Sequence, residues 1–169
     1  MGVEIERKFL VANEAWRDHA SAGQTIRQGY LARGGNSVRV RRTENRAVLT
    51  VKGPRSGLSR REHEYEIPLT EADELLGDLC LRPLIHKTRF EIVVADHVWE
   101  IDVYQGVHRG LVLAEVELDA EDEPFVRPIW LGAEVTGDPR YGFQGLSRTR
   151  LQWEALIEDV RSFAPAPAR

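Results

Sequence analysis

Alternation of charged and apolar residues dominates the first two thirds of the chain and predicts β-strands. Residues 3–11 show it most clearly, because Val3, Ile5 and Phe9 share one face of an extended segment while Glu4 and Glu6 share the other. The same two-residue period recurs over residues 25–32, 37–42, 47–52, 61–69, 87–92, 99–104 and 113–119. The pattern therefore predicts eight strands, mainly in antiparallel arrangement.

Helical spacing marks two segments between these strands. Thr70 is the predicted N-cap of a helix whose apolar stripe includes Ala72 and Leu76. Asn13 is expected to cap a shorter helix that carries Trp16. A few helices should therefore flank the strands.

The chain has 169 residues, which is close to the usual size of one domain. We expect a single domain over residues 1–163 that ends with a helix over residues 147–163, where apolar residues again follow helical spacing. Residues 164–169 are rich in Ala and Pro and are expected to form a disordered tail.

The polar faces of the predicted strands repeat charges of one sign. Acidic pairs two residues apart occur at positions 4/6, 62/64, 64/66 and 115/117, and basic pairs occur at 39/41 and 87/89. Such neighbours lie about 7 Å apart on one face of a strand and repel each other. The simplest interpretation is a sheet with its charged face in water. The scarcity of uncharged polar residues favours a second one, in which both charge signs line a wet tunnel and hold ligands.

A tunnel of this kind would suit a phosphate-rich anion and hard divalent cations. Its basic residues would be Lys8, Arg39, Arg41, Lys52, Lys87 and Arg89. Its acidic residues would be Glu4, Glu6, Glu62, Glu64, Glu66, Glu91, Glu100, Asp102, Glu115, Glu117 and Asp119. Carboxylates bind Mg²⁺ or Mn²⁺, and such ions bridge to phosphoryl oxygens. Polyphosphate with Mg²⁺ or Mn²⁺ is therefore a fitting ligand.

Composition narrows the partners. The net charge of −4 gives no overall field for nucleic acid or an anionic membrane. Only three of the 23 basic residues are lysine, and all three belong to the basic set above. Cys80 is the only cysteine, which excludes a disulfide framework within one chain. With no leader-like or membrane-spanning apolar run, a cytoplasmic location is expected.

The ordered strand motifs resemble those of the triphosphate tunnel metalloenzymes, the CYTH-domain superfamily. The chain opens with EIERKFLV, which is similar to the signature of that family. Further similar segments follow in order: RQGYL, VRVR, LTVK, EHEYEIPL, KTRF, WEIDVY and LVLAEVEL. The resemblance covers residues 2–119, and EVTGDPRY beyond them resembles the segment that follows the barrel.

The resemblance implies an α+β, mainly antiparallel β fold, an eight-stranded closed barrel that forms a charged tunnel. It implies metal-dependent hydrolysis of inorganic triphosphate, as in short bacterial inorganic triphosphatases. Phosphoryl oxygens would be bound by Lys8, Arg39, Arg41, Lys52, Lys87 and Arg89. The metal would be held by Glu4, Glu6, Glu62, Glu64, Asp102, Glu115 and Glu117. Tyr30 and Lys87 would assist the attacking water or the leaving group.

Other functions use the same fold. A nucleoside or thiamine triphosphatase, or an adenylate cyclase, is the main enzymatic alternative, and a non-catalytic polyphosphate or nucleotide sensor is the alternative of another class. The expected partner is a small triphosphate, with no nucleic acid and no membrane. A monomer or a homodimer is expected.

Overall fold

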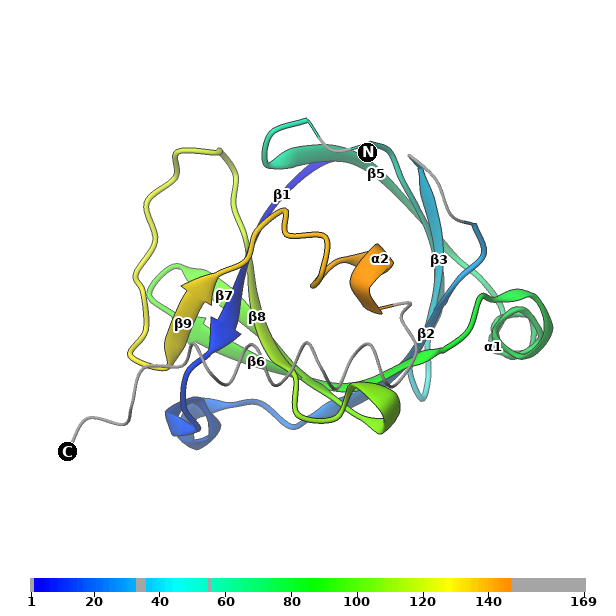
Figure 1. Ribbon diagram of the computed structural model, residues 1–169, viewed down its shortest axis with the longest axis horizontal. Helices are drawn as coiled ribbons and strands as arrows, with labels where there is room; N and C mark the ends of the chain where they lie inside the picture. The colour runs from blue at the N-terminus through cyan, green and yellow to red at the C-terminus, as the bar shows by residue number, and fades with distance from the viewer. Residues whose placement is uncertain (1, 33–35, 55, 147–169) are drawn as a thin grey trace.

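Eight antiparallel strands close into a barrel in the computed structural model, which describes residues 2–32, 36–54 and 56–146 (Figure 1). The strands are β1 (Gly2–Val11), β2 (Gln24–Tyr30), β3 (Ser37–Arg42), β4 (Ala47–Lys52), β5 (Ser59–Glu66), β6 (Ile85–Val94), β7 (His97–Tyr104) and β8 (Val112–Glu117). Around the ring their order is β5-β4-β3-β2-β6-β7-β8-β1, and β5 also pairs with β1. The predicted eight-stranded barrel is confirmed.

Strand β1 closes the ring by pairing on both of its edges. Residues 2–5 pair with β5, and residues 6–10 pair with β8. A ninth strand, β9 (Leu131–Glu134), pairs with Phe9 and Val11 of β1 and lies outside the barrel. This strand was not among the predicted ones.

Short helices connect the strands. They are the 3₁₀ helices η1 (Ala15–His19) and η3 (Gly106–His108), the α-helices α1 (Leu69–Glu74) and α2 (Phe143–Leu146), and a π-helical turn η2 (Leu75–Leu79) that continues α1. The carboxamide oxygen of Asn13 accepts a hydrogen bond from the Ala15 N–H at 3.0 Å, so it supports the start of η1 from just before its N-cap residue, Glu14. The predicted helix over residues 147–163 and the tail at 164–169 lie outside the described residues.

The prediction of Thr70 as an N-cap was wrong. Helix α1 begins at Leu69, and Pro68 occupies the N-cap position without a side-chain hydrogen bond. The fixed φ of Pro68 suits the residue that precedes a helix. The helix therefore begins two residues earlier than it would with Thr70 as the N-cap. Strand β5 consequently ends at Glu66 rather than Leu69.

The apolar faces of the strands pack outside the barrel. One cluster joins Phe9, Trp99 and Ile101 to Trp16 of η1 and to Trp130, all buried. A second cluster packs α1 and η2 against β3 and β4, and Figure 1 shows α1 outside the ring. Burial of these aromatic and aliphatic side chains supplies the main stabilisation of the fold and leaves the charged faces directed inward.

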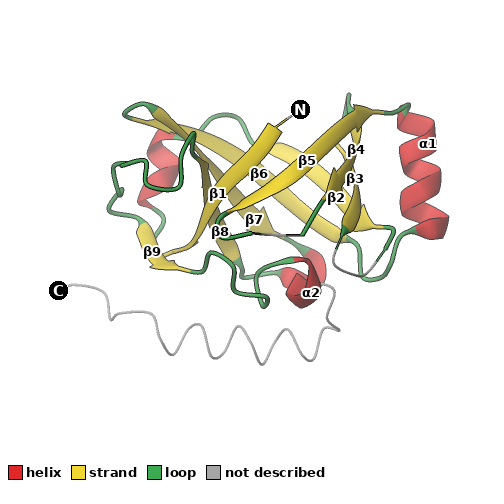
Figure 2. Cartoon of the chain, turned by 90° about the horizontal axis from the view of Figure 1, so that it is seen from above, coloured by secondary structure: helices red, strands yellow, loops and turns green. Residues whose placement is uncertain are grey.

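The segment of residues 135–146, called the closing segment below, lies across one end of the barrel. Figures 1 and 2 both place α2 over that opening. Val135, Tyr141 and Leu146 of this segment pack with Tyr104 and Leu113 in a third buried cluster. One end of the charged interior is thereby covered with apolar side chains.

Candidate active site

The barrel contains a cavity of about 1120 Å³ whose wall carries the charged inner faces of the strands. All six basic residues predicted to bind phosphoryl groups line it: Lys8, Arg39, Arg41, Lys52, Lys87 and Arg89. Six of the seven predicted metal ligands line it too: Glu4, Glu6, Glu62, Glu64, Glu115 and Glu117. Tyr30 also lines the wall. Residues far apart in the sequence therefore meet in one space that both charge signs share.

Asp102, the seventh predicted ligand, lies behind the cavity wall and is fully buried. Arg89 donates two hydrogen bonds to it, through Nε at 2.8 Å and Nη2 at 2.7 Å, and the ammonium group of Lys87 donates another. Burial opposes the ionisation of Asp102, but the charges of Lys87 and Arg89 outweigh it and lower its pKa. Asp102 therefore orients two cations of the wall.

Lys87 is a buried cation that lies beside the ring of Tyr104. Burial and the charge of Arg89 lower the pKa of Lys87 to about 8. Its Nζ atom lies 5.7 Å from the ring centroid of Tyr104, whose own pKa is raised by burial. The hydroxyl of Tyr30 accepts a hydrogen bond from Gln28 Nε2 at 3.3 Å. A lysine with this pKa can hold or release a proton near neutral pH.

Lys8 is fixed by carboxylates on its own strand and on the neighbouring one. Its Nζ atom lies 2.7 Å from Glu115 Oε1 and 3.7 Å from Glu6 Oε1. Burial disfavours the charged form of Lys8, but the charges of Glu115 and Glu6 raise its pKa above the ordinary value. Lys8 therefore remains a cation at any pH at which the protein would work.

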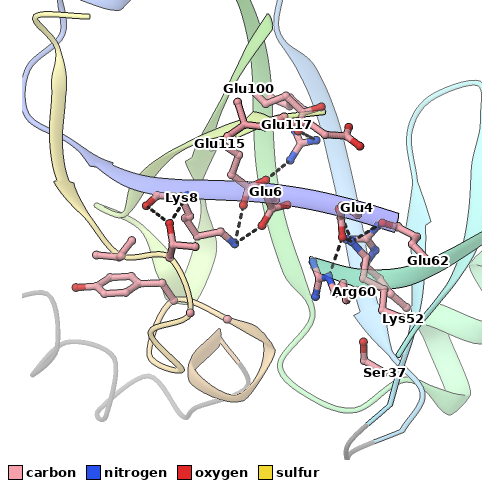
Figure 3. Close-up of a pocket in the computed structure, with 18 of the residues that line it drawn as sticks. Glu4, Glu6, Lys8, Ser37, Lys52, Arg60, Glu62, Glu100, Glu115 and Glu117 are labelled. Atoms are coloured by element: carbon pink, nitrogen blue, oxygen red, sulfur yellow. Dashed lines mark hydrogen bonds and ion pairs between the residues drawn. The ribbon is translucent and has the colours of Figure 1, made fainter. Parts of the chain in front are cut away.

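Glu4 is held by two cations (Figure 3). Lys52 Nζ donates to both of its oxygens, at 2.8 and 2.9 Å, and Arg60 Nε donates to Oε2 at 2.7 Å. Although burial opposes ionisation, the charges of Lys52 and Arg60 lower the pKa of Glu4 to about 2. Lys52 also pairs with Glu62 at 2.9 Å.

Arg60 is a cavity residue that the sequence analysis missed. The predicted strand began at residue 61, whereas β5 begins at Ser59. The signal was present, because Arg60 shares the two-residue period of Glu62 and Glu64 and so lies on the same face. Gln28, Thr50 and Glu100 also belong to the inner faces, and of these only Glu100 had been assigned to the tunnel.

The two arginines of β3 that line the cavity, Arg39 and Arg41, differ in their partners. Arg39 Nη2 donates to the hydroxyl of Thr50 at 3.2 Å, and that hydroxyl donates to Glu64 Oε1 at 3.0 Å. Arg41 has no hydrogen bond and no carboxylate within 4.0 Å among the described residues. Burial and the charge of Arg39 lower the pKa of Arg41. A partly buried guanidinium that is not directly paired with a carboxylate is costly, and a bound anion would relieve that cost.

Glu4, Glu6 and Glu117 are carboxylates on the inner faces of β1 and β8 whose charges act on one another. Glu6 lies directly opposite Glu117, and burial together with the charges of Glu4 and Glu6 raises the pKa of Glu117. Among the described residues, no three acidic, His or Cys side chains converge on one point. The carboxylate of Glu4 is bound by Lys52 and Arg60 instead of being directed toward Glu6 and Glu117. The donor set nevertheless fits a hard divalent cation, because all three groups are oxygen ligands whose mutual repulsion such an ion would relieve.

Comparison with known proteins agrees with this geometry. A CYTH domain matches residues 2–150. This chain belongs to the CYTH domain family. The predicted membership is therefore confirmed, and so is the barrel architecture that came with it.

Relatives of this CYTH protein have a stated activity. The inorganic triphosphatase of Acetivibrio thermocellus is 48% identical over 142 residues, which cover 83% of this chain and 90% of that protein. The inorganic triphosphatase of Nitrosomonas europaea is 38% identical over 149 residues, covering 85% and 96%. A crystal structure of an inorganic triphosphatase superposes with a TM-score of 0.63 at 33% identity, covering 88% of this chain and 97% of that one.

The sequence predicts no membrane partner, and the structure bears on this prediction only through its helices. Within residues 2–32, 36–54 and 56–146, no helix combines the length and the apolar character that crossing a lipid bilayer requires.

Proposed function

We propose that this CYTH protein hydrolyses inorganic triphosphate to pyrophosphate and phosphate inside its barrel. The observation that carries the proposal is the cavity itself, in which basic and acidic walls face one space and Arg41 has no carboxylate partner among the described residues. The activity named for relatives at 48% and 38% identity supports the same reaction.

The basic wall would bind the phosphoryl oxygens. Arginines offer paired N–H donors that match two oxygens of one phosphoryl group, and lysines supply point charges. In this role we place Lys8, Arg39, Arg41, Lys52, Lys87 and Arg89. Because several of these side chains, including Lys52, Lys87 and Arg89, are buried, their charges would stabilise the transition state more strongly than they would in water.

The acidic wall would hold the metal ion on which CYTH triphosphatases depend in general. We propose Mg²⁺ or Mn²⁺, held by residues drawn from Glu4, Glu6, Glu62, Glu64, Glu115 and Glu117. When bound, such an ion neutralises phosphoryl charge and makes the terminal phosphorus more electrophilic. Asp102, first expected among the ligands, is better placed to orient Lys87 and Arg89.

Lys87 and Tyr30 are the proposed catalytic residues. The oxygen of water attacks the terminal phosphorus while the bond to the pyrophosphate oxygen breaks, and the proton lost by water has to be accepted. Lys87, with its pKa lowered to about 8, is suited to hold or pass a proton near neutral pH. Tyr30 would orient water or the leaving group by hydrogen bonding.

The proposal is tested by following phosphate and pyrophosphate release from triphosphate by the purified protein. Activity should vanish in chelator and return with Mg²⁺ or Mn²⁺. Glu4→Gln should lose most of it, whereas Glu44→Gln, in an exposed turn outside the cavity, should not. Full turnover in chelator, or no phosphate release with either metal, would overturn the proposal. The cytoplasmic location and the monomeric or homodimeric state stay predictions.

A further inference from the structure

The contacts of Glu4 conflict with its proposed role as a metal ligand. Both of its carboxylate oxygens accept hydrogen bonds, from Lys52 Nζ and from Arg60 Nε. A divalent cation on the same oxygens would stand within a few ångströms of both side-chain cations and repel them. This repulsion favours the opening of at least one of the two contacts when a metal ion binds.

Arg60 is the partner better placed to leave. Lys52 is buried and also pairs with Glu62 at 2.9 Å, so it stays compensated if Glu4 turns away. Arg60 is more accessible, with 21% of its side chain exposed, and Glu4 is its one carboxylate partner within 4.0 Å among the described residues. Only Nε of its guanidinium donates to that partner. The two Nη groups have no hydrogen-bond partner in the described part of the chain and belong to a residue that lines the cavity.

We propose that Arg60 is a triphosphate-binding residue that Glu4 holds until a divalent cation takes over the Glu4 carboxylate. The substrate part of this inference rests on the proposed function, whereas the exchange on Glu4 does not. When metal and triphosphate are both bound, Arg60 has passed from a carboxylate to a phosphoryl oxygen, so its charge is paired again. Metal and triphosphate would then each favour the binding of the other, because each takes one member of the same ion pair.

Metal binding in the absence of triphosphate tests the exchange. We would titrate Mn²⁺ into the protein and follow the free ion by electron paramagnetic resonance. Arg60→Gln removes the competitor for Glu4 and should tighten Mn²⁺ binding about fivefold, as expected for a partly buried ion pair. The matched control is Arg61→Gln, which removes the same charge from the next residue of β5, on the exposed outer face, and should leave the affinity unchanged.

A double-mutant cycle separates the direct contact between Arg60 and Glu4 from the general electrostatic effect of removing a positive charge. In a Glu4→Gln background, Arg60→Gln should change the Mn²⁺ affinity by less than about twofold, because the carboxylate through which it acts is gone. Persistence of the full effect there would show a field effect and overturn the exchange. Unchanged or weaker Mn²⁺ binding by the Arg60→Gln protein would also overturn it.

Steady-state kinetics tests the substrate part. Arg60→Gln should raise the KM for triphosphate about tenfold with kcat changed by less than about threefold, and Arg60→Lys should recover most of that loss. An unchanged KM would overturn the binding role. If the wild-type protein did not hydrolyse triphosphate, the proposed function would fail, but the Mn²⁺ titration would still decide the exchange. Should Arg60→Gln not fold, Arg60→Lys replaces it in both measurements, with smaller shifts of the same sign.

Discussion

Glu6 and Glu117 lie directly opposite each other in the pairing of β1 with β8. Like charges at such positions destabilise a sheet, and burial together with the charges of Glu4 and Glu6 raises the pKa of Glu117. This repulsion lowers the stability of the folded protein, and a cation bound between the two carboxylates would relieve it. Removing one of the two charges should therefore increase stability and weaken metal binding.

Glu117→Gln should separate the two effects. In chelator, the substitution should raise the free energy of unfolding by about 0.5 kcal/mol, because one repelling charge is removed. With Mg²⁺ or Mn²⁺ present, it should lower kcat/KM for triphosphate at least tenfold. Denaturant unfolding and initial rates measure the two quantities, with Glu44→Gln as the control for loss of a charge. A destabilised variant with normal activity would contradict this account of the pair.

Lys87 and Arg41 should differ in kinetic signature. If Lys87 takes part in proton transfer as well as binding, Lys87→Ala should lower kcat by a larger factor than it raises KM. Arg41, a guanidinium without a carboxylate partner among the described residues, should act through binding, so Arg41→Ala should raise KM at least as strongly as it lowers kcat. Michaelis curves at saturating metal give both numbers. Equal and mild KM effects at the two positions would leave Lys87 as a binding charge only.

The Arg7–Glu134 pair joins β9 to β1 and predicts a pH-dependent contribution to stability. Arg7 Nε donates to Glu134 Oε1 at 2.9 Å, and this hydrogen bond lowers the pKa of Glu134 below its ordinary value of 4.5. A lowered carboxyl pKa stabilises the fold above the unfolded-state pKa, and that contribution disappears as pH falls through the lowered value.

Glu134→Gln should therefore cost about 0.5 kcal/mol of unfolding free energy at pH 7, as for other partly exposed pairs. The difference from the wild-type protein should shrink steadily below pH 4.5, where both chains become neutral at this position. Urea unfolding at several pH values measures it. A difference that stays constant down to pH 2 would show that charge at Glu134 does not matter.

The strands of the barrel could be predicted because the two faces of each strand lie in different environments, so charged and apolar residues alternate along its sequence. The inner face of β1 carries Glu4, Glu6 and Lys8, and the outer face carries Ile5 and Phe9. A two-residue period therefore shows which side chains share a face. The roles expected from the family resemblance then fell on residues that line one cavity, with the exception of the buried Asp102.

Other features depend on tertiary contacts that the sequence does not record locally. Strand β9 has four residues without clear alternation, and it exists because it pairs with the free edge of β1 next to Phe9. Burial of Asp102 behind Lys87 was equally hidden, since its alternation with apolar neighbours is the same as that of Glu100. Arg60 was missed for a local reason, the misplaced start of β5.

Substrate choice follows from the aromatic residues of the cavity. A nucleotide would need a stacking surface or base-edge partners for its base. Tyr104 and Tyr141 line the wall but are buried in the cluster that the closing segment forms with the barrel, and His97 interacts with Glu123. Tyr30, which lies among the charges, is the remaining aromatic group of the described wall. Inorganic triphosphate, in contrast, can be bound entirely by charged side chains.

The central claim is therefore tested most directly by comparing kcat/KM for inorganic triphosphate and for ATP. The measurement uses one protein preparation at equal free Mg²⁺ or Mn²⁺ and follows phosphate, pyrophosphate and cyclic AMP separately. We predict a preference for inorganic triphosphate of at least tenfold, or about 1.4 kcal/mol in transition-state binding. A preference for ATP, or cyclic AMP as the product, would contradict the assignment.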